Sequence, residues 1–288
     1  MSNQLAGRVA VVTGSTRGFG LAVARACAEA GAAVVLTSRT QKTVDNSVDM
    51  LKTSALQAVG RTADVQNLPE VEALLDLALE TYGRMDIWIN NAGIAGPYGP
   101  TIHLEPGTFK AVTATNVLGV YHGSLVAMRH FLQQRQGKLL NVLGRGAKSP
   151  TPYQNAYAAS KAWVKNFTVA LAQEYKESGV EVLAYNPGMM RTELLTEVAV
   201  VEGYEERLDV LETIVRMWAK PPEEPAQRVV ALVSEEGRTG RVINEANLLS
   251  LAGGALREGL RRLFGRTADA LEVEVHTVPA AYDAQVRQ

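Results

Sequence analysis

The stretch VAVVTGSTRGFG, residues 9–20, decides the fold. Its first four residues are small or β-branched and apolar, a composition typical of a buried strand. Glycines follow at positions 14, 18 and 20, and a helical pattern runs on from Leu21 to Ala30. A strand, a glycine-rich turn and a helix in this order predict an anion-binding turn. Glycine lets the backbone approach a phosphate closely, and the free N–H groups at a helix N-terminus favour negative charge.

Further strands and helices alternate along the chain. A helix is predicted to open at Pro69 and to end just before Gly83, and a long helix is predicted over 156–176. Strands are predicted at 34–36, 63–65, 86–89, 138–142, 181–184 and 241–243. This alternation predicts a three-layer α/β fold, in which a doubly wound parallel sheet lies between two layers of helices.

We expect one domain over residues 1–250 and a C-terminal extension over 251–288. The extension carries an apolar and basic helix pattern around Leu256–Phe264 and a strand-like run at 271–278. No internal repeat and no low-complexity linker divides the chain further.

Charge and cysteine content exclude several classes of protein. The 29 Lys and Arg nearly balance 30 Asp and Glu, so the basic excess typical of nucleic-acid binding is missing. Cys27 is the only cysteine, which excludes an intramolecular disulfide and a cysteine-based metal site. No apolar run reaches the roughly 18 residues that span a membrane, and the first residues lack a signal pattern. We therefore expect a cytoplasmic protein with a small-molecule substrate and without metal, nucleic-acid or membrane partners.

The end of the second strand indicates which dinucleotide binds. A carboxylate at this position would bond the ribose 2′-hydroxyl of NAD, but Ser38 and Arg39 stand there instead. Arg17, inside the glycine-rich turn, can reach the same region, and two guanidinium groups suit a 2′-phosphate. The alternative is that both arginines are solvated surface residues; we favour NADP(H). Asp64, at the end of the third strand, is predicted to accept a hydrogen bond from the adenine amine.

Four motifs in order resemble the short-chain dehydrogenase/reductase family. They are the turn at 13–20, the sequence NNAG at 90–93, the pair Tyr157 and Lys161, and Pro187-Gly188 with Thr192. The resemblance covers about residues 5–245. It implies a Rossmann-type fold, an NAD(P) cofactor, and hydride transfer between a carbonyl and an alcohol. Together with Ser38 and Arg39, it predicts these cofactor contacts: Gly14, Ser15, Thr16, Arg17, Gly18, Phe19, Gly20, Ser38, Arg39, Asp64, Val65, Asn91, Ala92, Gly93, Tyr157, Lys161, Pro187, Gly188 and Thr192.

The catalytic groups are predicted on one helix face. Tyr157 and Lys161 are four residues apart, and a neighbouring ammonium, together with the positive nicotinamide, is expected to lower the pKa of the tyrosine. Tyr157 would then act as general acid toward a ketone or as general base toward an alcohol, while Lys161 also holds the nicotinamide ribose. Asn116 matches the proton-relay asparagine of the family.

Gly144 departs from the family pattern. The family usually places a serine 13 residues before the tyrosine, where its hydroxyl holds the substrate oxygen. Losing such a donor typically costs about 3–4 kcal/mol, or roughly 10²–10³ in rate. Ser149, Asn155, Tyr153 or an ordered water is a candidate replacement, or the substrate supplies its own donor. We favour an NADPH-dependent enzyme that interconverts a ketone and a secondary alcohol. The alternatives are elimination or isomerisation on the same scaffold, and a non-catalytic NADP(H)-binding module.

The resemblance also implies a lid and an assembly. Residues 192–221 correspond to the segment that covers the substrate, and their apolar composition indicates a moderately apolar substrate. Packing of the lid onto the sheet explains that composition equally well. Residues 125–132 and 163–171 are apolar enough for the helix pairing that makes family members homodimers or homotetramers.

His103 and His122 have no carboxylate at a spacing useful for catalysis, and we interpret both as ordinary residues.

Overall fold

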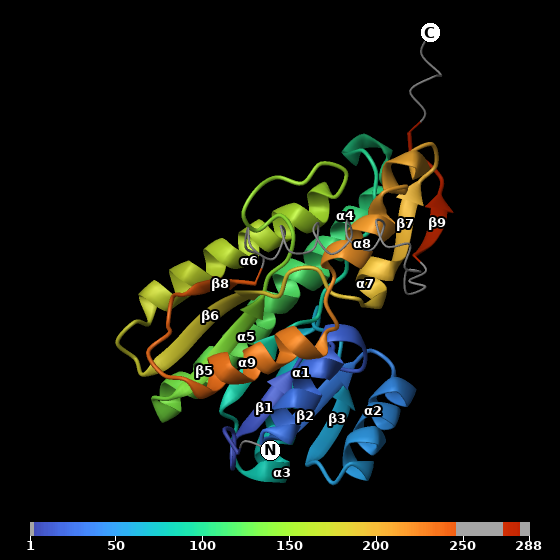
Figure 1. The fold of residues 1–288 in the computed structure, drawn as a ribbon. Coiled ribbons are helices and arrows are strands. Elements are labelled where there is room, and N and C mark those ends of the chain that lie inside the picture. The colour runs from blue at the N-terminus through green and yellow to red at the C-terminus, as the bar shows by residue number, and fades with distance from the viewer. Residues whose placement is uncertain (1–2, 246–272, 283–288) are drawn as a thin grey trace.

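The computed structural model describes residues 3–245 and 273–282. Its central feature is a seven-stranded sheet with the order β3-β2-β1-β4-β5-β6-β8, in which every neighbouring pair is parallel. The predicted doubly wound α/β fold is therefore confirmed (Figure 1). The strands are β1 (Val9–Val12), β2 (Ala33–Ser38), β3 (Ala58–Thr62), β4 (Ile87–Asn90), β5 (Gly137–Val142), β6 (Val180–Asn186) and β8 (Val242–Asn244).

Helices cover both faces of this sheet. Successive side chains of a strand point to opposite faces, so β1 buries Val9 and Val11 in one layer and Ala10 and Val12 in the other. This explains why β1 is apolar without a gap. One layer contains α1 (Gly18–Glu29), α2 (Gln41–Thr53) and α9 (Glu223–Ser234), and the other contains α3 (Leu68–Tyr82), α5 (Gly119–Gln134) and α6 (Asn155–Glu174).

The helix predicted from Pro69 is confirmed as α3. Gly83 follows it with a φ of 75°, a left-handed conformation that glycine adopts easily and that ends a helix. The predicted strand at 63–65 is wrong, because β3 already ends at Thr62. The carboxylate of Asp64 accepts the N–H of Gln66 at 2.9 Å, and this local turn leads the chain away from the sheet.

A π-helix of five residues, 114–118, interrupts the path from α4 (Pro106–Thr113) to α5. Such one-turn insertions are rare and often occur at functional sites, because they shift one side chain out of the regular helical positions. Here the insertion carries Asn116, which is fully buried.

The lid adds a second, two-stranded sheet. The lid, residues 192–221, contains α7 (Glu193–Thr196), β7 (Glu197–Val201) and α8 (Leu211–Trp218). In the small sheet, β7 pairs in parallel with β9 (Glu274–Val278). Figure 1 shows this small sheet beside α7 and α8, away from the central sheet. The strand-like run predicted at 271–278 corresponds to β9, whereas the helix pattern around Leu256–Phe264 lies outside the described residues. In the part of the chain that the structure describes, none of the helices combines the length and apolarity that a membrane crossing requires.

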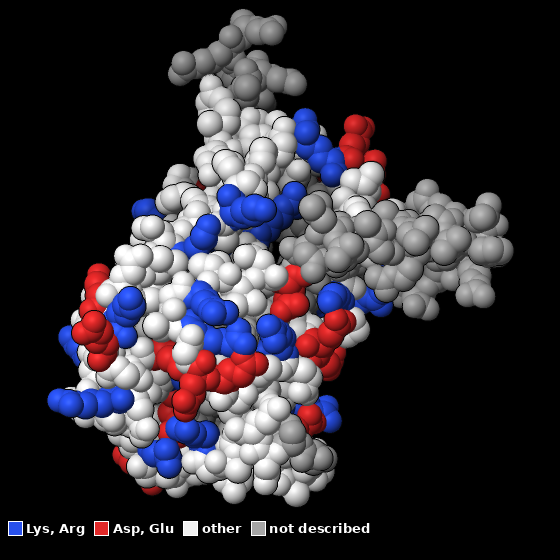
Figure 2. Space-filling view, turned by 60° about the vertical axis from the view of Figure 1, so that its left-hand side comes forward, with Lys and Arg blue, Asp and Glu red and all other residues white. Residues whose placement is uncertain are grey.

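Surface charges contribute little to holding this fold together. Acidic and basic side chains lie next to one another over the lower part of the face in Figure 2. Arg25 and Glu29 form an exposed pair at 2.8 Å on α1, and such pairs contribute about 0.3–0.5 kcal/mol. Asp86 is different because it is buried. It accepts two hydrogen bonds from Arg84, one from Arg8 and one from the N–H of Val9, and so ties the start of β4 to β1.

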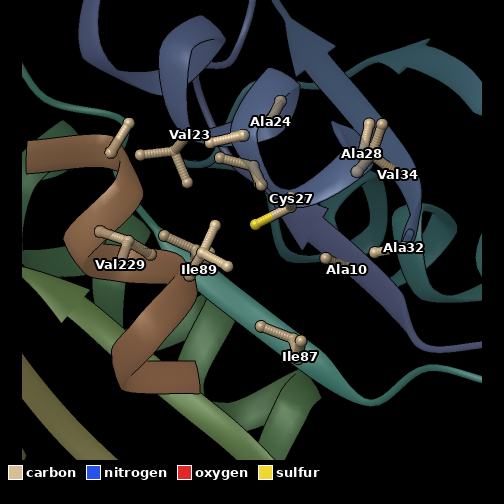
Figure 3. Packing of buried hydrophobic residues seen from close by; sticks show 14 of the residues in the cluster. Ala10, Val23, Ala24, Cys27, Ala28, Ala32, Val34, Ile87, Ile89 and Val229 are labelled. Atoms are coloured by element: carbon tan, nitrogen blue, oxygen red, sulfur yellow. The ribbon is translucent and has the colours of Figure 1, made fainter. Parts of the chain in front are cut away.

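The core between α1 and the sheet is tightly packed around Cys27 (Figure 3). The side chain of Cys27 lies among Val23, Ile89 and Val229, which come from α1, β4 and α9. It has no exposed surface, and burial raises the pKa of the thiol to about 12. Cys27 is therefore a packing residue and not a nucleophile.

We expect the Cys27 thiol to be unreactive in the folded protein, because a thiol with this pKa is almost entirely protonated at neutral pH. Labelling of the native chain with a thiol reagent should be at least about 100-fold slower than labelling in urea. Rapid labelling of the native chain would contradict the packing of α1 against α9.

Candidate functional site

The strand order reverses between β1 and β4. β1 continues into the turn at 13–20, and the neighbouring β4 continues into the segment 91–93. In open α/β sheets, ligands bind at the carboxyl ends of the strands at such a reversal. The fold thus brings together two motifs that lie far apart in the sequence.

Close backbone contacts require the glycines of the turn. A Cβ on Gly20 would lie 2.2 Å from the carbonyl oxygen of Gly14 and 2.4 Å from Nδ2 of Asn91. Gly14 and Gly18 have φ angles of 61° and 51°, in the left-handed region. α1 begins at Gly18, and within the described residues no side chain caps its first turn. The N–H groups of that helical turn are therefore available to an anion. We call the glycine-rich turn at residues 14–20 the cradle, and its shape fits the pyrophosphate of a dinucleotide.

Thr13 and Asn91 lock this turn to the end of β4. Nδ2 of Asn91 donates to the carbonyl oxygens of Thr13 and Gly14 at 2.9 and 3.0 Å. The backbone N–H groups of Asn91 and Ala92 donate to Oγ1 of Thr13 at 3.0 and 3.1 Å. The side chain of Asn91 therefore shapes the cradle. Thr13 belongs to the quoted motif, but the sequence did not single it out as a site residue.

Three other residues of the turn face the protein interior. Ser15 is fully buried, and its Oγ accepts the N–H of Thr37, which fixes the turn against β2. The carbonyl oxygen of Thr16 accepts the hydroxyl of Ser47 on α2 at 3.3 Å. Phe19 is buried and packs in the core under α1. Ser15 and Phe19 therefore support the turn with their side chains, and Thr16 supports it with its backbone carbonyl.

The basic end of the cradle contains Arg17 and Arg39. Both side chains are exposed, and across residues 3–245 and 273–282 neither forms an ion pair with a carboxylate. Ser38 is the last residue of β2, and its hydroxyl contacts Oγ1 of Thr43 on α2 at 2.7 Å. This end of the site therefore offers two unneutralised guanidinium groups, which suits an additional phosphate.

The predicted adenine contacts follow β3, the parallel neighbour of β2, and so lie at the same edge of the sheet. Asp64 is half-buried and its carboxylate bonds the local backbone, while Val65 is buried. Nδ1 of His122 lies 2.9 Å from the carbonyl oxygen of Val65, so this histidine braces the segment, in agreement with its interpretation as an ordinary residue. Among the described residues, no group of three or more His, Cys, Asp and Glu is arranged to hold a metal ion.

Tyr157 and Lys161 lie together on α6, as predicted. Nζ of Lys161 is 5.7 Å from the centre of the Tyr157 ring and donates to the carbonyl oxygen of Val142 at 3.0 Å. Lys161 is only 4% exposed, and burial lowers its pKa to about 8. Burial also raises the pKa of Tyr157 to about 12. Desolvation of the phenolate causes this rise. The lowering expected from Lys161 together with the positive nicotinamide concerns the complex with the cofactor and stays a prediction.

The hydroxyl of Tyr157 lies against Gly144. A Cβ on Gly144 would come within 2.3 Å of Oη of Tyr157, so the tyrosine occupies the space that a serine side chain would need. Ser149 is exposed, and Asn155 is exposed and donates to Oγ1 of Thr101 at 3.2 Å. Tyr153 is half-buried in a cluster of aromatic rings.

Asn116 connects the cradle to the catalytic helix. Its side chain exchanges two hydrogen bonds of 2.9 Å with the backbone of Ile94, and its Nδ2 also donates to Oγ of Ser160 at 3.0 Å. Oγ of Ser160 donates in turn to the carbonyl oxygen of Tyr157 at 2.6 Å. A Cβ on Gly93 would meet both Oδ1 of Asn116 and Nζ of Lys161, so all of these groups adjoin one another. Sequence reasoning missed Ser160, although its position three residues after Tyr157 places it one helical turn away.

The segment after β6 returns to the cradle. Gly188 has a φ of 79°, and its N–H donates to Oδ1 of Asn186, which turns the chain sharply after the buried Pro187. Thr192 then lies beside the cradle, because a Cβ on Gly18 would be 3.4 Å from Cβ of Thr192. The structure thus brings the four sequence motifs to one edge of the sheet.

Comparison with known proteins gives a consistent result. A family model described as short chain dehydrogenase matches residues 8–202. Glucose 1-dehydrogenase 2 of Bacillus subtilis is 31% identical over 238 residues, which are 82% of this chain and 91% of that protein. Actinorhodin polyketide ketoreductase, solved as a variant with NADPH, has a TM-score of 0.75 and 29% identity over 87% of this chain and 99% of that chain. A 3-ketoacyl-(acyl-carrier-protein) reductase from Brucella melitensis, solved with NADH, has a TM-score of 0.73 and 29% identity over 84% of this chain and 97% of that chain. The chain belongs to the short-chain dehydrogenase/reductase family of oxidoreductases.

Proposed function

We propose that this chain is an NADPH-dependent reductase that interconverts a ketone and a secondary alcohol on a moderately apolar small molecule. The observation that carries the proposal is the position of the Tyr157 hydroxyl. It lies against Gly144, close to a buried ammonium and at the same sheet edge as the glycine cradle. A general acid, a positive charge and a dinucleotide-binding turn form the set that carbonyl reduction requires.

The cofactor is held by groups along this edge. The backbone of 14–20 holds the pyrophosphate, Arg17 and Arg39 hold the 2′-phosphate, and Lys161 holds the nicotinamide ribose. Lys161 fits this role because its buried ammonium has three donors and only one of them, to Val142, is paired within the described residues. When bound, NADPH supplies the hydride of the reduction. The solved relatives contain either NADPH or NADH, so the preference for NADP(H) rests on the two arginines of this chain.

Tyr157 supplies the proton. With a pKa raised to about 12, its hydroxyl is protonated at neutral pH and can donate to the carbonyl oxygen of a ketone. Lys161, whose pKa is about 8, is charged below that pH and stabilises the phenolate that remains. Asn116 and Ser160 hold the first turns of α6 in place and thereby orient both groups. Proton return to Tyr157 follows a path beside Asn116, as the resemblance implies.

The lid favours an apolar substrate of moderate size. Leu195, Tyr204, Ile214 and Met217 are half-buried, so each leaves part of its apolar surface exposed. Only part of the lid packs inward, since Val200 and Val201 are buried and Val215 is buried on α8. Two of the solved relatives are ketoreductases, and this agrees with a ketone as the substrate.

We also propose that the chain assembles into a homodimer or homotetramer. Leu118, Tyr121 and Trp163 are large apolar residues that remain 41%, 43% and 36% exposed on the π-helix, α5 and α6. The ring of Trp163 stacks on that of Phe167 with the ring centres 4.8 Å apart. This gives the face a flat aromatic surface suited to binding a second copy of this chain. The cytoplasmic location expected from the sequence and the division into residues 1–250 and 251–288 are part of the same proposal.

Replacing Tyr157 by Phe tests the reaction. We expect ketone reduction, followed as NADPH consumption over a panel of cyclic and aromatic ketones, to fall by at least about 10²-fold, because the proton donor is removed. NADPH binding should stay within about threefold of wild type. Tight NADPH binding without turnover of any ketone by the wild-type chain would contradict the proposal and favour a binding module. Product without cofactor consumption would favour elimination or isomerisation.

Arg17→Ala and Arg39→Ala test the cofactor assignment. Each loss of a charge-assisted contact is expected to weaken NADPH binding about 10–100-fold and to leave NADH binding within about threefold, measured by fluorescence titration. Arg25→Ala, on the helix that follows Arg17, is the matched control, because Arg25 is paired with Glu29 and should affect neither cofactor. Equal weakening of NADPH and NADH would show that the arginines do not contact the 2′-phosphate.

Variants at Gly144 test whether the Tyr157 hydroxyl acts from its position against Gly144. Gly144→Ala adds a methyl group where Oη lies, and we expect kcat/KM for ketone reduction to fall about 10–100-fold through displacement of Tyr157. Gly144→Ser causes the same displacement but adds a donor, so it should recover part of that loss. An alanine variant as active as wild type would show that Tyr157 does not work from this position.

A further inference from the structure

An aromatic cluster joins three segments that follow the carboxyl ends of β4, β5 and β6. Tyr98 follows β4, Tyr153 precedes α6, and Tyr204 belongs to the lid. The rings of Tyr98 and Tyr153 stack with their centres 5.3 Å apart, and those of Tyr153 and Tyr204 are 6.1 Å apart. The guanidinium of Arg207, also in the lid, lies 4.5 Å from the centre of the Tyr153 ring. Tyr153 thus contacts each of the other three side chains.

Backbone contacts hold the same segments together. The N–H of Gly99 donates to the carbonyl oxygen of Tyr153 at 2.8 Å. Tyr98 pairs with β7 through two bonds, to the carbonyl of Ala199 at 2.8 Å and from the N–H of Val201 at 2.9 Å. A Cβ on Gly99 would lie 2.3 Å from Cγ2 of Val201, so these strands are in direct contact. β7 is therefore paired along one edge with the segment after β4.

The other edge of β7 is paired as well. β9 runs beside it in register from Glu197 to Val201, and the N–H of Glu202 donates to the carbonyl of Val278 at 2.9 Å. The N–H of Ala281 then reaches the carbonyl of His103, whose ring packs edge-on against Tyr204 with centres 5.8 Å apart. The base of the lid is closed by a bridge between Met190 and Lys220. The lid is thus held at its base and at its tip, and Tyr153 belongs to the tip.

The backbone of Tyr153 is in a conformation that needs support. Its φ of 66° lies in the left-handed region, which a bulky residue adopts only where its surroundings hold it there. α6 begins two residues later, and Tyr157 lies in its first turn. The contacts that hold the Tyr153 ring therefore also set the direction in which the chain enters the catalytic helix.

We propose that Tyr153 is a positioning residue that couples closure of the substrate lid to the orientation of Tyr157. The inference rests on the proposed reduction, in which Tyr157 is the proton donor. When Tyr204 and Arg207 dock on the Tyr153 ring, the left-handed conformation at 153 is held and the first turn of α6 is fixed. When the lid opens, that support is lost and the Tyr157 hydroxyl leaves its seat against Gly144. Proton donation is then coupled to enclosure of the substrate.

Two substitutions of Tyr153 separate the ring from the hydroxyl. Tyr153→Phe keeps the stacking surface, whereas Tyr153→Asn removes it with a residue that tolerates a positive φ. Arg207→Gln removes the lid's cation from the same ring, and Glu206→Gln is its matched control, because Glu206 neighbours Arg207 and has no contact with the cluster within the described residues. A thermal melt of each full-length variant verifies that it is folded.

Hydrogen–deuterium exchange of residues 197–204, with and without saturating NADPH, reports opening of the lid. We expect exchange to rise at least about threefold in Tyr153→Asn and Arg207→Gln and to stay within about twofold in Tyr153→Phe and Glu206→Gln. In ketone reduction, Tyr153→Asn should lower kcat and raise KM, each at least about fivefold, with NADPH affinity unchanged. Tyr153→Phe should have a kcat and a KM close to those of the wild-type chain.

Two results would overturn the inference. Unchanged exchange in Tyr153→Asn would show that the ring does not hold the lid. A loss of activity in Tyr153→Phe equal to that in Tyr153→Asn would show that the hydroxyl acts on the substrate directly. If the wild-type chain reduces no ketone, the proposed function fails, but the exchange experiment still decides whether Tyr153 holds the lid.

Discussion

The contact between the glycine-rich turn and the end of β4 constrains the rest of the structure. Gly20 lies so close to the carbonyl of Gly14 that no side chain fits, and the amide of Asn91 closes the gap from the neighbouring strand. This close contact holds the start of α1 against the sheet. The first N–H groups of α1 then lie near the crevice between β1 and β4. The same contact therefore sets both the packing of α1 and the shape of the turn that we propose holds the pyrophosphate.

The catalytic pair depends on burial in the same way. Burial drives the pKa of Tyr157 up and that of Lys161 down, so each group is pushed toward its neutral form. At neutral pH this leaves a protonated tyrosine beside an ammonium, which is the combination that a reduction needs. An ammonium with a single protein acceptor is costly to bury. The ribose hydroxyls of a bound dinucleotide would supply the missing acceptors, so cofactor binding relieves a cost that folding leaves in place.

Local patterns in the sequence were sufficient to predict the main sheet and its cradle. The glycines at 14, 18 and 20 and the apolar strands are short-range signals, because turn geometry and burial on both faces act on a few adjacent residues. The pairing of β7 with β9 was not predicted, since the two strands are far apart in the chain and neither reveals its partner. The π-helix at Asn116 and the early end of β3 before Asp64 depend on tertiary contacts. The raised pKa of Tyr157 in the chain alone was not predicted, because it comes from desolvation that only the fold reveals.

Gly144 has a different meaning in the structure than in the sequence. The sequence shows only that the serine hydroxyl is missing at this position. In the structure, the hydroxyl of Tyr157 occupies the space that a side chain at position 144 would need. A tyrosine with a pKa near 12 is a weak acid, so it gives up its proton only to an oxygen that has already become strongly basic. In the proposed reduction, negative charge on the substrate oxygen would therefore develop before the proton moves, and the nearby charge of Lys161 would stabilise it. That attraction is strongest when water is excluded. In the proposed reduction, the absence of the serine would therefore make a closed lid more important, and β7 of the lid is paired along both edges.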